Sequence, residues 1–425
     1  MKIFRKLITT LLIYYHLATA LDITENRITT DIDKIDEGNP VVICSNSYWS
    51  IVDVAKVEFK EDITVESNAM LYVSSTSDIS LDFGHPEYKK LLNNGIIAVN
   101  GLASSAYVKV HLVANPFVNN GGMYFASSGS NSDNWYLTSN GEMVNNDLMV
   151  FYQKQRSASL VDIRGMTNNG QIYFRNSNFL INGDRAGTGC FTAIDGGSFY
   201  IKYPEMNFAS TLSWYLADST ASMVVNGDSN EDIDNITFKV YGFGNGNKIE
   251  LSSTSEKLDD STYIYDAEAG VLTITSPCGY ICNFDIGTGY NTELFEDFIL
   301  IEEGESPDQN KKVKCITYPG KVPARELPAS CQIPYKDAPP FPMDDTFPMT
   351  TVFTSTWEST DNAGSTITES GLISRIGTSD NTISTFPNPP VYTSTWVDDD
   401  TVTRSGLISQ SGIDVETIST FPLNP

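Results

Sequence analysis

Nine short segments of this chain repeat one pattern at a nearly fixed spacing. Each segment has a turn triplet of small or polar residues, one variable residue, and then an apolar–variable–apolar run. The triplets follow one another every 22 to 27 residues, which is the signature of a solenoid with one coil per repeat. The third triplet residues are Ser47, Ala69, Gly95, Gly121, Asp147, Gly170, Gly197, Ala221 and Asn247.

The local period within each segment indicates strands. The apolar residues alternate, so they lie on one face of a strand, and the segments are rich in Val, Ile, Phe and Tyr. Asn and Gly in the triplets tolerate the left-handed backbone of sharp corners, and stacked Asn corners can form side-chain amide ladders. We predict an all-β fold whose main part is a β-helix (β-solenoid) of about nine coils; a β-sandwich with many hairpins is the alternative. The two inward registers read Trp49, Leu71, Ile97, Met123, Met149, Ile172, Phe199, Met223 and Ile249, and Ile51, Val73, Val99, Phe125, Phe151, Phe174, Ile201, Val225 and Leu251.

Charge and the N-terminus indicate a secreted protein. The net charge of −26 argues against a nucleic-acid partner, which needs a basic face. A basic start precedes the apolar stretch 7–17, and Ala18-Thr19-Ala20 has the small-x-small form of a cleavage site. We therefore predict a signal peptide at 1–20.

All six cysteines follow that cleavage site. An even number in a secreted chain favours disulfides and no free thiol, but six cysteines allow fifteen pairings and the sequence does not choose among them. Only His85 and His111 remain in the mature chain, so we expect no metal site. The disulfide candidates are Cys44, Cys190, Cys278, Cys282, Cys315 and Cys331.

The chain divides into four parts. After the signal peptide we expect the β-helix at 21–251 and a C-terminal β module at 252–335, which packs on the solenoid's open end and includes a hairpin around 266–270. A Ser/Thr/Pro-rich repeat follows at 336–425, where each unit carries Thr-Ser-Thr-Trp and Ser-Gly-Leu-Ile-Ser. We interpret it as an extended stalk; a small β-rich repeat domain is the alternative.

No catalytic motif is present in the sequence. It lacks a Gly-x-Ser-x-Gly elbow, a phosphate-binding loop and His-Glu-x-x-His, so we expect no catalytic residue and no cofactor. The only N-glycosylation sequon begins at Asn235. The position between the two inward registers faces outward, and tyrosines recur there. Exposed tyrosines suit binding, although strand propensity alone also favours them. The candidate adhesive strip is Tyr72, Tyr124, Tyr173 and Tyr200.

Several motifs resemble one protein family. They include Thr167-Asn168-Asn169-Gly170-Gln171-Ile172, Gly187-Thr188-Gly189-Cys190, Val240-Tyr241-Gly242-Phe243-Gly244-Asn245-Gly246-Asn247-Lys248 and Pro328-Ala329-Ser330-Cys331. Over about residues 20–335 the chain resembles the N-terminal domain of the hyphally regulated (Hyr/Iff-like) cell wall proteins of Candida-type yeasts. The resemblance implies a fungal surface adhesin with a β-helical effector domain, a small β-sandwich-like module at 252–335, a Ser/Thr-rich stalk and a glycosylphosphatidylinositol anchor. It supplies no catalytic residues.

We hypothesise a cell-wall adhesin that supports attachment, aggregation and biofilm formation. Its partners are then host-cell, abiotic or fellow-cell surfaces, and cell-wall glucan through an anchor that the printed chain does not show. The alternatives are a polysaccharide-active β-helix enzyme and a structural coat protein that binds nothing.

Overall fold

The computed structural model describes residues 20–131, 133–157, 160–201, 208–226, 237–253, 261–276, 279–301 and 312–343, together with strands between 351 and 421. The predicted signal peptide lies almost wholly outside these residues, as do Asn235 and Cys278. The chain divides into two compact units, 1–343 and 344–425.

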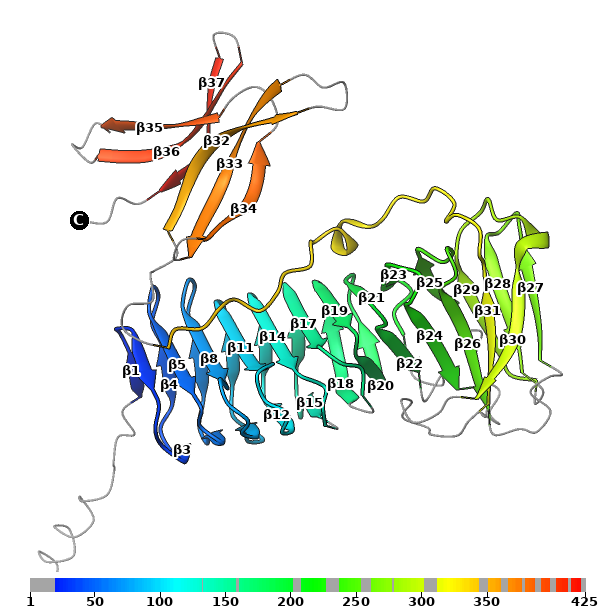
Figure 1. The fold of residues 1–425 in the computed structure, drawn as a ribbon, viewed down its shortest axis with the longest axis horizontal. Coiled ribbons are helices and arrows are strands. Elements are labelled where there is room, and N and C mark those ends of the chain that lie inside the picture. The colour runs from blue at the N-terminus through cyan, green and yellow to red at the C-terminus, as the bar shows by residue number, and fades with distance from the viewer. Residues whose placement is uncertain are drawn as a thin grey trace, which may run out of the picture. The chain divides into compact units, whose positions relative to one another are not determined.

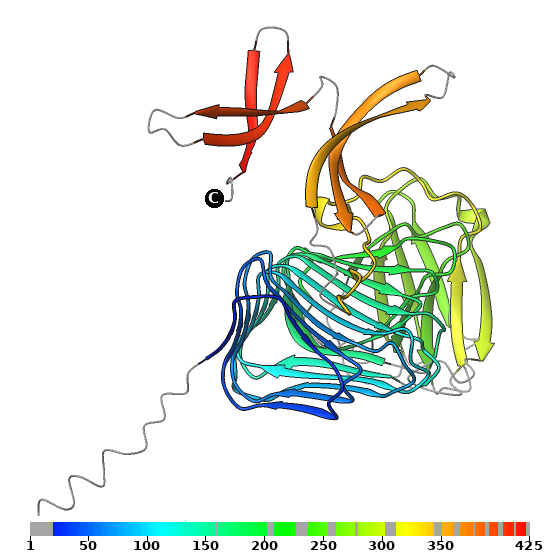
Figure 2. The ribbon, with the colours of Figure 1, turned by 60° about the vertical axis from the view of Figure 1, so that its left-hand side comes forward.

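Unit 1 is a β-solenoid, as the alternating registers predict, and it has about eight turns where the sequence predicts about nine (Figure 1). Successive coils add parallel strands to two sheets, and Figure 2 shows the coils stacked around a core. The 13-stranded sheet, here sheet B, runs in the order β2 (Arg27–Thr29), β5 (Tyr48–Val52), β8 (Met70–Ser74), β11 (Ile96–Gly101), β14 (Gly122–Ser127), β17 (Leu148–Gln153), β19 (Gln171–Arg175), β21 (Cys190–Ile194), β23 (Ser213–Leu216), β25 (Thr237–Tyr241), β29 (Ile281–Asp285), β28 (Val271–Thr275) and β27 (Thr262–Asp266).

The 18-stranded sheet, sheet A, contains two ladders that merge at the long strand β18 (Leu160–Asn168). The shorter ladder contains β1 (Leu21–Ile23), β4 (Val41–Ile43), β7 (Ile63–Val65), β10 (Leu91–Asn93), β13 (Phe117–Asn119) and β16 (Met143–Asn145). The longer ladder contains β3 (Lys34–Glu37), β6 (Lys56–Phe59), β9 (Leu81–His85), β12 (Val108–Ala114) and β15 (Asn134–Ser139), then β18, β20 (Asn178–Ala186), β22 (Ser198–Ile201), β24 (Ser222–Asn226) and β26 (Lys248–Ser253).

The inward registers hold as predicted for the first six segments. Phe125, Phe151 and Phe174 stack in adjacent coils with ring centroids 5.0 and 5.4 Å apart, and all three are buried. Burying such rings side by side removes a large apolar area from water and so stabilises the stack of coils.

The predicted amide ladders are also present at one corner. Buried Asn93, Asn119, Asn145 and Asn168 donate in series from Nδ2 to the next Oδ1 at 2.7, 2.7 and 2.8 Å. A second, exposed ladder runs beside it through the following residue of each triplet. The ladders satisfy side-chain polar atoms at a corner where the backbone turns sharply.

The last three predicted segments also face the core, but they belong to sheet A and not to sheet B. After Phe174 the next strand of sheet B is β21, so Phe174 pairs with Ala193 and not with Ile201. The segments that begin after Gly197, Ala221 and Asn247 are β22, β24 and β26 of sheet A. A turn followed by alternating apolar residues occurs at two corners of each coil. The first six predicted segments follow one corner, and the last three follow the other.

The region 261–317 extends the two sheets, so the predicted separate sandwich module is not confirmed. β31 (Lys312–Thr317) pairs antiparallel with β26 and with β30 (Glu296–Ile301). The predicted hairpin is present as β27 and β28. The antiparallel strands complete both sheets at the last coil. Short 3-10 helices lie at Thr292–Leu294 and Ala329–Cys331.

Unit 2 contains two three-stranded antiparallel sheets, one for each predicted repeat. Both sheets shift register at the same place in the Gly-Leu-Ile motif. An extended stalk is therefore not confirmed, and the backbone follows the alternative of a small β-rich repeat. The strands are β32 (Thr351–Thr360), β33 (Thr366–Ile376) and β34 (Ser379–Phe386), then β35 (Val391–Val397), β36 (Thr403–Ser411) and β37 (Asp414–Phe421).

Candidate binding surfaces

The predicted tyrosine strip is not exposed. Tyr72, Tyr124 and Tyr173 do share one register of sheet B, with Ala98 and Val150 between them. Their exposed fractions are only 3, 6 and 6 %. The prediction of an adhesive strip open to solvent is therefore wrong for these three residues.

Tyr200 is not part of that strip. It lies on β22 in sheet A, between Leu180 and Val224, and is 2 % exposed. Its cluster also includes Cys315 of β31. The change from sheet B to sheet A after Phe174 explains why the sequence placed Tyr200 in line with the other tyrosines.

An extended segment, residues 318–343, covers the outer face of sheet B and is called the strap here. It starts after β31 and runs back across the strands of sheet B toward β5 (Figure 1). Ile333, Tyr335, Ala338 and Phe341 pack on the strap-binding face, which consists of Tyr48, Tyr72, Ala98, Tyr124, Leu148, Val150 and Tyr173.

The first half of the strap is held firmly. Arg325 donates to the carbonyl oxygens of Val240 and Asp285 at 3.1 and 2.8 Å and pairs with the Asp285 carboxylate at 2.9 Å. A disulfide then joins Cys331 to Cys190 on β21. These links cross 40 to 141 residues of sequence and attach the strap to the later coils of the solenoid.

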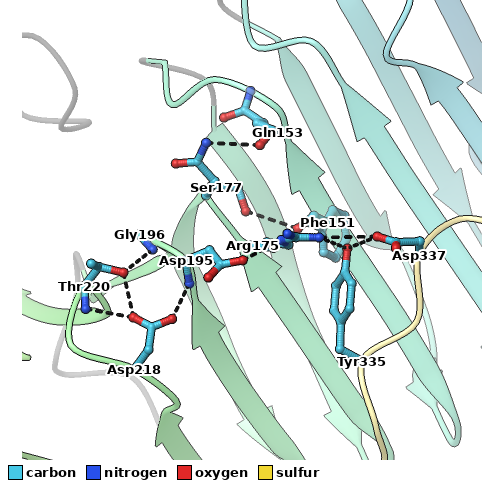
Figure 3. Close-up of polar contacts among 11 residues, drawn as sticks. Phe151, Gln153, Arg175, Ser177, Asp195, Gly196, Asp218, Thr220, Tyr335 and Asp337 are labelled. Carbon is cyan, nitrogen blue, oxygen red and sulfur yellow. Dashed lines mark hydrogen bonds and ion pairs between the residues drawn. The ribbon is translucent and has the colours of Figure 1, made fainter.

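Arg175 organises the middle of the strap (Figure 3). Its Nε lies 2.7 Å from Asp195 Oδ2, and its Nη1 lies 3.3 Å from Asp337 Oδ1 and 3.4 Å from the Tyr335 hydroxyl. The Tyr173 hydroxyl donates to the Ile333 carbonyl at 2.6 Å. Burial raises the pKa of Tyr173 and of Tyr335 to about 12, so both stay neutral at physiological pH.

Sheet A offers a surface of a different kind. The outward side chains of β12, β15 and β18 line a groove of about 470 Å³, and this groove continues into a hollow of about 140 Å³ over β6 and β9. We call the larger hollow the β12–β15–β18 groove. It is lined by Lys109, Val110, His111, Asn134, Tyr136, Asp162 and Arg164.

The groove combines aromatic rings with both signs of charge. The rings of His111 and Tyr136 lie 5.1 Å apart, and the Arg164 guanidinium lies 4.9 Å from the centre of the Tyr136 ring. Arg164 also pairs with Asp162 at 3.2 Å. Burial, and then the charge of Lys109, lower the pKa of His111, which favours the neutral ring. Such a set of rings, donors and acceptors suits recognition of polar, hydroxyl-bearing ligands.

The cysteines are only partly as predicted. Cys190 and Cys331 form a disulfide, but Cys44 and Cys282 have free thiols. Burial raises the pKa of the Cys282 thiol, which lies in the solenoid core. The prediction that every cysteine is paired is wrong for these two. A buried cysteine in a core behaves as a small apolar residue, and a count of cysteines cannot distinguish this role.

Among the residues that the structure describes, no group of three or more His, Cys, Asp and Glu side chains could hold a metal ion. No helix in the same part of the chain is long and apolar enough to cross a membrane.

The fold and the strap define the class of this protein, which is a β-solenoid with an extended segment covering the outer face of one sheet. The family described as "Hyphally regulated cell wall protein N-terminal" matches residues 11–342, and the family "Hyphally regulated cell wall GPI-anchored protein 1" matches 340–371. The chain belongs to the hyphally regulated cell wall protein family, and it is a protein of the cell wall or cell surface.

Similar proteins come from Candida albicans. The chain is 33 % identical to Cell wall protein IFF3 over 88 % of its own length and 39 % of that protein. It is 33 % identical to Hyphally regulated cell wall protein 3 over 93 % of its length and 30 % of that protein. The chain thus spans less than half the length of these curated relatives.

Proposed function

We propose that this chain is the outward-facing region of a cell-wall adhesin, and that it contacts other surfaces through the β12–β15–β18 groove. The observation that carries the proposal is the contrast between the two sheets. The strap covers the tyrosines of sheet B, whereas His111, Asn134 and Arg164 of the groove are exposed to solvent. The partners are host-cell, abiotic or fellow-cell surfaces.

The chemistry of the groove favours a polar partner with hydroxyl groups. The Tyr136 ring can pack against the C–H face of a sugar, while Asn134 and Lys109 of the groove and Asp82 of the adjoining hollow offer donors and acceptors for its hydroxyls. Together with the adjoining hollow, the groove crosses five neighbouring strands from β6 to β18, which suits an extended chain better than a small molecule. Attachment to wall glucan then depends on an anchor of the kind that the second family description names.

The test is binding of the purified chain to human epithelial cells, plastic, yeast cells and a glycan array. We expect the double variant Tyr136→Ala with Arg164→Ala to bind at least tenfold more weakly. Tyr107→Ala is the matched control, because Tyr107 is 46 % exposed and lies outside the groove. Equal binding by wild type and the double variant would refute the groove. New reducing ends on bound glycans would indicate the enzyme alternative instead.

A further inference from the structure

The second half of the strap lies on the protein without joining a sheet. Residues 332–343 have no strand assignment, and Pro334, Pro339, Pro340 and Pro342 lack the N–H that a ladder requires. A proline-rich segment is already extended before it docks, so it loses little conformational entropy when it binds. This half of the strap is therefore built like a docked peptide.

The strap-binding face in turn is built like a peptide site. Its tyrosines and small apolar residues receive Ile333, Tyr335, Ala338 and Phe341 of the strap. Aromatic-lined grooves that accept proline-rich extended segments are a recurring mode of peptide recognition. The side chain of Tyr335 meets Tyr173 edge-on, with ring centroids 5.4 Å apart.

Residues 332–343 are held by non-covalent contacts, whereas residues 318–331 end at the disulfide. The Ser50 hydroxyl donates to the Pro342 carbonyl at 2.6 Å near one end, and Arg175 and Tyr173 hold the other. Between them a cavity of about 90 Å³ remains beside Ala338, over Tyr124 and Val150. The segment therefore leaves part of the strap-binding face beside Ala338 unfilled.

We propose that the strap-binding face is a docking site for an extended proline- and aromatic-containing segment, and that its second occupant is the segment 332–343 of another copy of this chain. The segment known to fit this face is 332–343 itself. Copies held close together on a cell wall have the high local concentration that exchange of a segment between copies requires. The inference therefore rests on the proposed function.

The Cys190–Cys331 disulfide sets the limit of the exchange. It holds residues up to 331 on their own solenoid, so release stops there and the uncovered face keeps its fold. Tyr335 follows four residues beyond the disulfide, and four extended residues span at most about 14 Å. Since packed sheets lie about 10 Å apart, that length reaches a solenoid lying alongside.

The experiment uses the full chain and a fluorescent peptide with the sequence of residues 332–343. In the strap-weakened variant Tyr335→Ala with Phe341→Ala, the face is uncovered while the disulfide remains. We expect this variant to bind the peptide at least tenfold more tightly than wild type, and Phe341→Ala alone to show an intermediate gain. A peptide with the same two alanines should not bind. Circular dichroism and thermal melting check that each variant is folded.

Light scattering then identifies the partner. Wild type incubated below its melting temperature should form a dimer, and the strap-weakened variant should not. Failure of the folded variant to bind the peptide would overturn the docking site, and peptide binding with no wild-type dimer would overturn the second copy as partner. The Tyr136→Ala, Arg164→Ala variant should dimerise normally, which separates this result from any failure of the groove.

Discussion

Cys190 and Cys331 lie 141 residues apart in the sequence, with their Cα atoms 5.2 Å apart across a disulfide. One partner is on a strand of the solenoid and the other is on the strap, so the bond fastens the segment that covers sheet B. The same bond separates the part of the strap with firm anchors from the part that lies on tyrosines.

Removal of this disulfide should loosen the strap. Closing a loop of this length restricts the unfolded chain, and we expect Cys190→Ala with Cys331→Ala to lower the free energy of unfolding by about 2–5 kcal/mol. Urea melts measure the loss, and limited proteolysis should cut within 318–343 sooner than in wild type. Unchanged stability together with an unchanged cleavage rate would mean that the non-covalent contacts hold the strap.

The two amide ladders should differ in their contribution to stability. Asn119→Ala removes a buried amide that donates to Asn145 and accepts from Asn93, leaving both without that partner, at a cost of about 2–4 kcal/mol. Asn120→Ala is the matched control in the exposed ladder, and water can replace its bonds there. We expect a loss below about 1 kcal/mol for it. Equal losses in urea melts would contradict the distinction between the ladders.

Alkaline pH should release the strap. Burial raises the pKa of Tyr124, Tyr173 and Tyr335 to about 12, above the ordinary value of 10. The folded state holds these protons more tightly than the unfolded state, so the stabilisation is complete below pH 10 and is lost as the pH rises to 12. Ultraviolet titration and proteolysis of the strap should change together in that window. In Tyr335→Phe, which has no hydroxyl to ionise at this position, the increase in proteolysis between pH 10 and pH 12 should be smaller.

Tyr124 should contribute to stability almost as a core residue does. Phe151→Ala leaves a cavity between two stacked rings and should cost about 3–5 kcal/mol. On the sequence alone, a change at Tyr124 is expected to cost far less, because it faces outward. Since the strap covers Tyr124, we now expect about 2–4 kcal/mol for Tyr124→Ala. A loss below about 1 kcal/mol in urea melts would mean that the strap is not closed in solution.

The solenoid could be predicted because its signal is local and repeated. Alternation fixes the inward face of each strand, and the Asn triplets mark one corner. After Phe174 the prediction assigns the repeated segments to the wrong sheet. The two ladders of sheet A merge there into the long strands β18 and β20, so the coil becomes shorter. The same turn-and-alternation pattern then occurs at a second corner of the coil. Local patterns cannot tell the two corners apart.

The covered face could not be predicted from local patterns, because the strap meets strands some 160 residues earlier in the chain. One signal was present in the sequence. Ala98 and Val150 stand in the outward register beside the tyrosines, and apolar residues at an outward position indicate a cover. The groove could not be predicted because its residues come from three different coils and lie outside the nine repeated segments on which the prediction rests. They include Tyr136, His111 and Arg164.

Detachment under flow of yeast cells that display the chain tests directly whether the groove is the adhesive surface. Cells with Tyr136→Ala and Arg164→Ala should detach at least tenfold faster than wild type, and Tyr107→Ala should match wild type. Tyr173→Phe, which removes only a hydroxyl beneath the strap, should also match wild type. If the groove variant stays attached like wild type while Tyr173→Phe detaches, the covered face of sheet B and not the groove is the adhesive surface.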